Sequence, residues 1–459
     1  MRNGKLYIVM REFTRLALGF YFRRIDHFHA DRVPLNGPVL FVSNHPGSLT
    51  DSFLIGLGVP RRVNFIATAQ MFRFAPLRCL LARCGVIPIN RAKDDPRAMR
   101  TVADTFEACY RVFERGETVG IFPEGVTYDD SRLREIKSGA ARMALEIEHR
   151  HQGALGLQVV PIGLTFSAKQ LYRSTALVNF GEPLRAADFI EGYADNRKDC
   201  ILRLTAEIER RIQAQIVHIP ALEQTRVIEA VRRLYLDRLR VGHSESGEPI
   251  SPRAEELVLT QKIVAAVEHV YRTQPERAAS FAARLDAYER WLRRLQIHDE
   301  VVAEQERPER FVAGSLLLAT LAVVGAPLAL YGWIHRAIPA AIVVFAVARF
   351  TAPDRRKAQT AITSIVAGTV AFSVCYGAFV AIFHAVFGWP WSLWYALSLV
   401  PASLVAFYYV RQLRHLLRAV RYVSILVRAP VAARRLMARR ADLVAEIETV
   451  HREIGENLK

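Results

Sequence analysis

The fold is decided by the stretch Phe41-Val42-Ser43-Asn44-His45-Pro46-Gly47-Ser48-Leu49-Thr50-Asp51. It ends an apolar run at a histidine and reaches a carboxylate six residues later. An imidazole can accept a proton near neutral pH, and a carboxylate can hold its tautomer. Residues six apart on a regular helix point about 120° apart. We therefore expect His45 in a loop that Pro46-Gly47 folds back toward Asp51 on a first helical turn. A surface loop that starts a helix explains the same residues.

Composition limits the classes of protein that fit. A chain of 459 residues is long enough for two or three domains. The five cysteines form no CxxC pair, which indicates reduced thiols and argues against a metal site. A net charge of +17 indicates an anionic partner. No nucleic-acid module is recognisable, and the arginines lie in amphipathic patterns and beside apolar spans, so we predict membrane lipids and no nucleic acid as partners.

Residues 1–34 are expected to hold an amphipathic N-terminal helix over 5–24. Its apolar positions alternate with Arg11 and Arg15, a pattern typical of a helix lying in the membrane plane. It has neither an uninterrupted apolar core nor an A-x-A site, so it is not a signal peptide. A helix that packs on the next domain is the alternative.

An α/β domain is predicted over residues 35–195. Apolar runs typical of strands lie at 39–42, 63–67, 86–89, 119–122, 159–164 and 176–180. Helical patterns lie between or after them, at 50–57, 70–84, 96–115, 137–151 and 184–190. This alternation is typical of a largely buried sheet, in which ligands bind at the ends of the strands.

Two turns after predicted strands, and one predicted helix start, carry chemically useful residues. Arg91 ends one run and offers a planar fork of donors that suits a phosphate. Glu124-Gly125 follows another, where glycine lets the backbone approach a ligand and the glutamate can hold a hydroxyl. Lys137 precedes the amides of Ser138-Gly139, which can open a helix toward an anion. Each signal alone is weak.

Together, four blocks resemble the glycerolipid acyltransferase family in their order and spacing. They are Asn44-His45 with Asp51, Pro88-Ile89-Asn90-Arg91, Phe122-Pro123-Glu124-Gly125, and Val160-Pro161-Ile162-Gly163. The resemblance covers roughly residues 35–190. It implies transfer of a fatty acyl group from acyl-CoA or acyl carrier protein to a glycerophosphate hydroxyl, with the thioester as a substrate and no cofactor.

The resemblance also implies roles for individual residues. His45 is then the general base on the acceptor hydroxyl, and Asp51 orients it. Arg91 grips the acceptor phosphate, while Glu124 and Gly125 line the acceptor site. The family usually has four residues between the histidine and the aspartate, whereas this chain has five, a form similar to the fungal glycerol-3-phosphate acyltransferases. Glycerol-3-phosphate is therefore the favoured acceptor and lysophosphatidate the alternative.

Other classes of function are weighed against this one. A hydrolase that uses Ser43 or Ser48 stays open, although the chain has no G-x-S-x-G motif. A non-catalytic lipid-binding or scaffold protein that keeps the fold is a further alternative. A pore or transporter is disfavoured because the expected spans carry no buried ionisable residue except His384.

Residues 196–310 are predicted to be a helical region with no assigned chemistry, and 242–247 a loop within it. His218, His243 and His269 are expected to be ordinary polar residues.

A transmembrane region is predicted over 311–410. Uncharged runs at 312–334, 358–383 and 391–410 are long enough to cross a bilayer. The run at 338–348 is a half-span or a fourth crossing. Arginines flank the set, whereas the turn around Trp389 carries no charge, which favours a cytoplasmic catalytic domain. Residues 411–459 form a basic amphipathic C-terminal tail broken by Pro430; it contacts anionic headgroups or is a solvated or self-associating helix.

Overall fold

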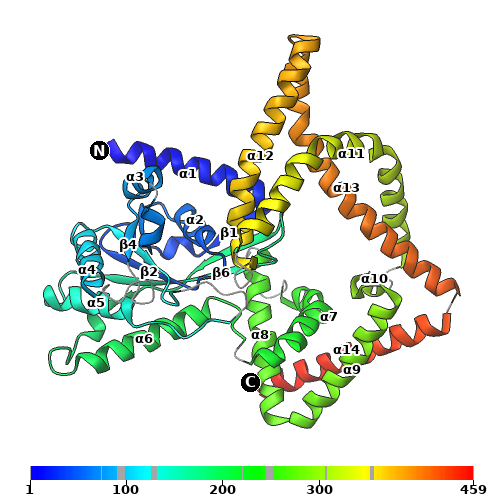
Figure 1. Cartoon of the computed structure of the whole chain (residues 1–459). Helices are drawn as coiled ribbons and strands as arrows, with labels where there is room; N and C mark the ends of the chain where they lie inside the picture. The colour runs from blue at the N-terminus through cyan, green and yellow to red at the C-terminus, as the bar shows by residue number, and fades with distance from the viewer. Residues whose placement is uncertain are drawn as a thin grey trace. The chain divides into compact units, whose positions relative to one another are not determined.

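The chain folds into two compact units of α/β and helical structure. A computed structural model (Figure 1) describes residues 2–73, 75–89, 99–125, 132–219, 221–243, 252–304, 308–351, 356–428 and 430–457. The first unit comprises Met1–Pro220, Pro249–Leu257 and Arg349–Ile365, and the second comprises Ala221–Glu248, Val258–Ala348 and Val366–Lys459.

The described part of the first unit contains one eight-stranded sheet in the order β1-β7-β6-β2-β5-β3-β4, with β8 paired to β6. Its strands are β1 (Arg24–Phe28), β2 (Val39–Ser43), β3 (Val63–Thr68), β4 (Ile87–Ile89), β5 (Thr118–Ile121), β6 (Gln158–Phe166), β7 (Thr175–Phe180) and β8 (Leu184–Arg185). Strand β6 runs antiparallel to β7 and β8, and the other pairs are parallel. The six predicted strands therefore exist, with β2 in the interior of the sheet.

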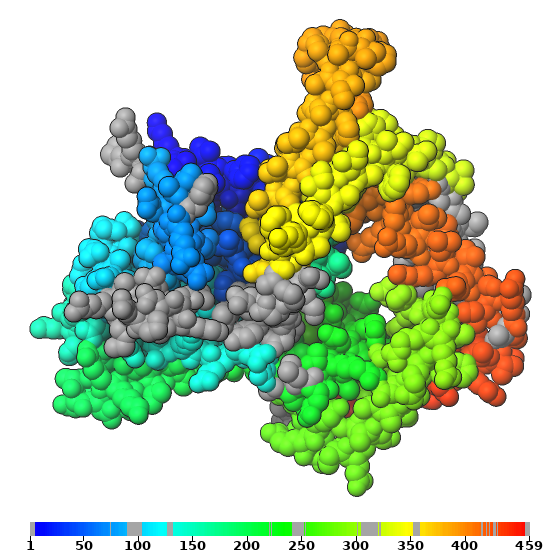
Figure 2. Space-filling model, in the orientation of Figure 1, coloured from blue at the N-terminus to red at the C-terminus, as the bar shows by residue number. Residues whose placement is uncertain are grey.

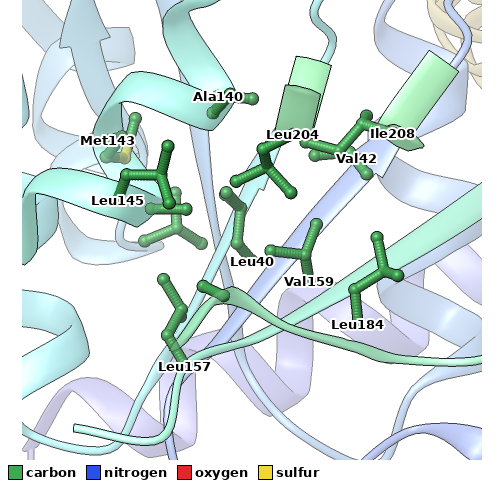
Figure 3. Packing of buried hydrophobic residues seen from close by; sticks show 14 of the residues in the cluster. Leu40, Val42, Ala140, Met143, Leu145, Leu157, Val159, Leu184, Leu204 and Ile208 are labelled. Atoms are coloured by element: carbon green, nitrogen blue, oxygen red, sulfur yellow. The ribbon is translucent and has the colours of Figure 1, made fainter. Parts of the chain in front are cut away.

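Helices cover both faces of this sheet because side chains of β2 alternate between two cores. Val39 and Phe41 pack with residues of α1 (Arg2–Tyr21) and α2 (Leu49–Gly58). Leu40 and Val42 face the opposite cluster, which Figure 3 shows. That cluster draws its helical members from α4 (Met99–Glu114), α5 (Gly139–Arg150) and α6 (Arg197–Ala214). The predicted α/β class is confirmed, and a strand with two buried faces explains its unbroken apolar run.

Three of the predicted boundaries are wrong. The N-terminal helix ends at Tyr21, and Arg24 begins a strand that pairs in parallel with β7. Residues 184–190 are not a helix, because Leu184 pairs with Val159 of β6 and leaves room only for a 3-10 turn, Ala186–Phe189. The expected helix at 70–84 is a 3-10 turn, Ala69–Phe72, followed by α3 (Ala75–Arg83). Proline at position 76 lacks an N–H and suits only a first helical turn.

The second unit is helical. After a short 3-10 turn (Leu222–Gln224), its helices, some of which extend into the first unit, are α7 (Thr225–His243), α8 (Pro252–Thr273), α9 (Pro275–Leu295), α10 (Asp299–Glu304), α11 (Pro308–Phe350), α12 (Arg356–Phe387), α13 (Trp391–Arg428) and α14 (Pro430–Asn457). Helix α14 packs against α7 and α9, with Leu436, Leu443 and Val444 buried. The apolar face of the C-terminal tail therefore serves this bundle, and its contact with headgroups stays a prediction. Most of the predicted loop 242–247 lies outside the described residues.

Three helices are long and apolar enough to cross a membrane, in the described part of the chain. These candidate spans are Val323–Phe350, Gln359–Phe387 and Trp391–Ile425. Figure 1 shows α12 and α13 as antiparallel neighbours joined by a short turn. Helix α11 continues through both the 312–334 and the 338–348 runs, with Pro327 and Pro339 inside it. The shorter run is therefore part of one helix rather than a separate half-span.

The α11 span carries ionisable residues that the predicted apolar runs did not include. His335 and Arg336 lie within the α11 span because the helix continues between the two apolar runs. The His335 ring lies 2.7 Å from the hydroxyl of Tyr395, and Arg336 donates to the carbonyl of Ser403 at 3.3 Å. These polar contacts with α13 let the helix accommodate both side chains.

Candidate active site

The site forms where β2 and β5 end side by side. These strands are parallel neighbours, so their carboxyl ends meet at one edge of the sheet. His45 follows β2 and Glu124 follows β5, which brings residues 79 positions apart into contact. Asn44 fixes the chain between strand and loop, because its side-chain amide accepts from the Leu164 N–H at 2.8 Å and donates to the Leu164 carbonyl at 3.0 Å.

The loop after β2 turns His45 back onto the first turn of α2. The His45 Nδ1 atom lies 2.9 Å from Asp51 Oδ2, and the same oxygen accepts the Gly47 N–H at 2.8 Å. Ser48 precedes the helix with φ at 59°, a conformation that non-glycine residues rarely adopt. The folded-back geometry expected for His45 and Asp51 is present.

Asp51 is fully buried, and burial is the main influence on its acidity. Burial raises the pKa of the Asp51 carboxyl, while hydrogen bonds from His45 and the Gly47 amide and the charge of Lys169 oppose the rise. Among the described residues, Asp51 Oδ1 has no hydrogen-bond partner. Asp51 Oδ1 thus lies against packed groups, and Oδ2 makes both contacts to the loop.

The His45 ring is held between a carboxylate and an aromatic face. It stacks on Phe122 with ring centroids 4.0 Å apart and planes tilted by 15°. Phe65 stacks behind Phe122 at 6.1 Å. The His45 side chain keeps 17% of its surface exposed, so the imidazole stays accessible from outside the protein. With Nδ1 turned to Asp51, Nε2 is the nitrogen that can meet a hydroxyl.

Glu124 anchors backbone rather than facing solvent. Its Oε1 accepts the His45 N–H at 2.8 Å, and its Oε2 accepts the Arg134 N–H at 3.3 Å. The residue is 6% exposed. Burial raises the pKa of the Glu124 carboxyl, and the two backbone hydrogen bonds oppose that rise. Contact of this carboxylate with a substrate hydroxyl therefore stays a prediction, whereas its hold on His45 is direct.

Gly125 and Lys137 lie together at the edge of the same site. Gly125 has φ at 72°, and a Cβ on it would come 2.8 Å from Lys137 Nζ. The Lys137 N–H donates to the Pro123 carbonyl at 2.9 Å, which ties the segment before α5 to the turn after β5. Helix α5 begins at Gly139, two residues after the predicted start at 137. Arg91 lies outside the described residues.

Ser43, one of the alternative nucleophiles, directs its hydroxyl to the neighbouring Asn44. It is buried, and its hydroxyl donates to the Asn44 carbonyl at 3.0 Å. His218 Nδ1 accepts the Leu133 N–H at 3.3 Å, a structural contact. Within the described ranges, no group of three or more His, Cys, Asp or Glu side chains could hold a metal ion.

Two contributors to the site carry no signal in the sequence. Lys169 lies between β6 and β7 and donates to the Pro46 carbonyl at 2.9 Å. Phe166 lies against Gly47, because a Cβ on that glycine would come 3.0 Å from the Phe166 ring. Only the register of the sheet brings these residues, more than a hundred positions along the chain, to the loop after β2.

Comparisons with known proteins find an acyltransferase family model and acyltransferase relatives. Residues 24–165 match the family model described as Acyltransferase. An uncharacterised acyltransferase of Schizosaccharomyces pombe is 26% identical over 388 residues, which cover 66% of this chain and 56% of that protein. Glycerol-3-phosphate O-acyltransferase 1 of Saccharomyces cerevisiae is 28% identical over 201 residues, covering 42% of this chain and 25% of that protein.

A 1-acyl-sn-glycerol-3-phosphate acyltransferase of Borreliella burgdorferi is 23% identical over 176 residues, covering 38% of this chain and 64% of that protein. The chain thus matches about half the length of the Schizosaccharomyces protein and a quarter of the Saccharomyces enzyme.

Proposed function

We propose that the protein is a membrane-anchored O-acyltransferase of phospholipid synthesis, with its catalytic domain in residues 24–165, which match the Acyltransferase family model. It transfers a fatty acyl group from acyl-CoA or acyl carrier protein to glycerol-3-phosphate. The observation that carries the proposal is the contact between His45 Nδ1 and the buried Asp51 carboxylate at 2.9 Å.

The proposed reaction uses His45 as a general base. Its Nε2 takes the proton of the acceptor hydroxyl while the hydroxyl oxygen bonds to the thioester carbonyl carbon. The carbon–sulfur bond then breaks, and the departing thiolate takes the proton back from the imidazolium. Asp51 stabilises the imidazolium between these steps. A positioned base contributes about 10² to 10⁴ in rate, and a thioester needs no further activation.

The acceptor phosphate is proposed to meet cations at the edge of the site. Lys137 is exposed there, beside Gly125. Arg91 is the second proposed phosphate ligand, assigned from its position after the predicted strand at 86–89. Glycerol-3-phosphate is favoured by the similarity to the Saccharomyces glycerol-3-phosphate enzyme and by the five-residue spacing between His45 and Asp51. Lysophosphatidate is the alternative, favoured by the similarity to the Borreliella enzyme.

Attachment to a membrane is proposed to involve α1 as well as the three candidate spans. One side of α1 is packed on the domain, with Leu18 and Tyr21 buried. The other side exposes an apolar stripe made of Val9, Phe13, Leu16 and Phe20. Figure 2 shows α1, in dark blue, at the surface of the first unit next to α3. Such a stripe suits the interface of a bilayer, and the arginine bias around the spans favours the cytoplasmic face.

The test is acyl transfer by the purified full chain in lipid vesicles. Labelled acyl-CoA and acyl carrier protein are offered with each acceptor in turn. His45→Ala should lower kcat by at least about a hundredfold. His151→Ala is the matched control, because His151 is also near a carboxylate, 3.4 Å from Glu114, but lies at the surface. Undiminished product from His45→Ala would refute the base, and no product from the wild type with either acceptor would refute the proposed activity.

A further inference from the structure

The connection between β6 and β7 contacts the loop after β2 that carries His45, although it belongs to none of the four sequence blocks of the acyltransferase resemblance. Lys169, on this connection, donates from Nζ to the Pro46 carbonyl at 2.9 Å. Pro46 directly follows His45, so the contact lies one residue from the proposed base. The lysine is half-buried. A charged donor forms a stronger hydrogen bond than a neutral one, especially where water is partly excluded.

This connection, residues 167–174, is itself well held. The Ser167 N–H donates to the Thr175 carbonyl at 3.0 Å, and the Thr175 N–H returns to the Ser167 hydroxyl at 3.0 Å. The Leu171 N–H closes an inner turn on Ala168 at 2.9 Å. The Arg173 N–H donates to the Tyr21 carbonyl at 2.7 Å. The backbone that carries Lys169 is therefore held in place by hydrogen bonds.

The loop that Lys169 contacts needs external support. Ser48 has φ at 59°, a strained conformation that persists only where the surroundings impose it. Proline at position 46 has no N–H to contribute to the loop. Gly47 is pressed between the Asp51 carboxylate and the Phe166 ring. The conformation that brings His45 to Asp51 is therefore not one that the loop adopts by itself.

We propose that Lys169 is a positioning residue for acyl transfer: its ammonium fixes the Pro46 carbonyl and thereby holds the His45 imidazole against Asp51. The proposal rests on the proposed acyltransferase function. Lys169 has no assigned contact with substrate; it acts through the loop.

The charge of Lys169 gives this role a signature in the pH profile. Among the described residues, His45 and Lys169 lower the pKa of the Asp51 carboxyl, and the Asp51 charge raises the pKa of the nearby Glu124 carboxyl. Without the ammonium, the pKa of Asp51 rises further above its usual range. The acid limb of the kcat profile should then move to higher pH, which a purely structural defect would not produce.

The experiment compares Lys169→Met and Lys169→Arg with the wild type in the full chain. Methionine keeps the length of the stem and removes the charge, whereas arginine keeps both charge and donor. Lys198→Met, at an exposed position of α6, is the matched control. Acyl transfer is measured against pH in lipid vesicles, and hydrogen exchange is measured on the peptide that covers 44–52.

Lys169→Met should lower kcat at least about tenfold, since misplacing a catalytic group by about 1 Å can cost roughly a hundredfold. KM for both substrates should stay unchanged, the acid limb should shift upward, and exchange of 44–52 should quicken. Lys169→Arg and Lys198→Met should match the wild type. A normal kcat in Lys169→Met, a raised acceptor KM at unchanged kcat, or no rescue by arginine overturns the proposal. If the wild type itself transfers no acyl group, the proposed function fails, and hydrogen exchange alone still decides the role of Lys169.

Discussion

Replacing Gly47 by alanine should disable the site through one added methyl group. The new Cβ would lie 2.5 Å from Asp51 Oδ1 and 3.0 Å from Cζ of Phe166. Carbon atoms in ordinary contact are about 3.5 Å or more from their neighbours, so the carboxylate would have to retreat by roughly 1 Å. Its bond to His45, now 2.9 Å, would then be lost or stretched. The Gly47 backbone itself is not in the left-handed region, so the effect is steric.

The expected loss in kcat is about a hundredfold, the cost of moving a catalytic group by that distance. Overpacking of a buried site should also lower the free energy of unfolding by about 1–3 kcal/mol. The assay is acyl transfer at saturating substrates together with thermal unfolding. Gly19→Ala serves as the control, because a Cβ at that position meets nothing within 4 Å. A Gly47→Ala protein with kcat within about threefold of the wild type would refute the tight packing of the loop on Asp51.

Three further predictions concern charge, burial and thiol reactivity. Burial raises the pKa of the Asp51 carboxyl above its unfolded value near 3.8, so this group stabilises the fold at low pH and loses that contribution as pH rises through the raised pKa. In denaturant unfolding from pH 4 to 7, Asp51→Asn should therefore gain stability relative to the wild type as pH rises. A trend in the opposite direction would contradict the raised pKa. Arg440 donates to the buried Asp299 carboxylate at 3.1 Å, so Arg440→Met should lower the free energy of unfolding by about 3–5 kcal/mol, and a change below about 1 kcal/mol in denaturant unfolding would argue against a buried pair. Burial raises the pKa of the Cys109 thiol to about 12 whereas Cys79 is exposed, so mass spectrometry after treatment with a thiol reagent should find Cys79 modified first and Cys109 only after unfolding.

Strands buried on both faces were the most predictable part of the fold. Val39 to Val42 form a continuous apolar run because the sheet is covered on both sides, and such a run is visible without any partner. Strand β1, in contrast, reads Arg-Ile-Asp-His-Phe and looks like the end of a polar helix. Only its pairing with β7, about 150 residues further along, makes it a strand. That information is absent from the local sequence.

The site residues likewise divide into those that local sequence predicts and those whose contacts depend on distant segments. His45 and Asp51 were predictable because their loop is local and its Pro-Gly turn has a known tendency to fold back. Glu124 was found as part of a motif, but its hold on the His45 N–H depends on β2 and β5 being neighbours. In the second unit, His335 and Arg336 interrupt the apolar pattern and so look like a break between spans. The structure keeps them inside one helix because their polar partners come from a different helix.

The two carboxylates around His45 have a consequence for how such a site can change. Asp51, on α2, holds the ring, and Glu124, in the turn after β5, holds the backbone. The histidine is thus tethered at two points that no single loop controls. Substitutions in one loop can alter the shape offered to an acceptor while the proton-accepting atom keeps its place. Substrate preference and proton transfer are, in this architecture, separately adjustable.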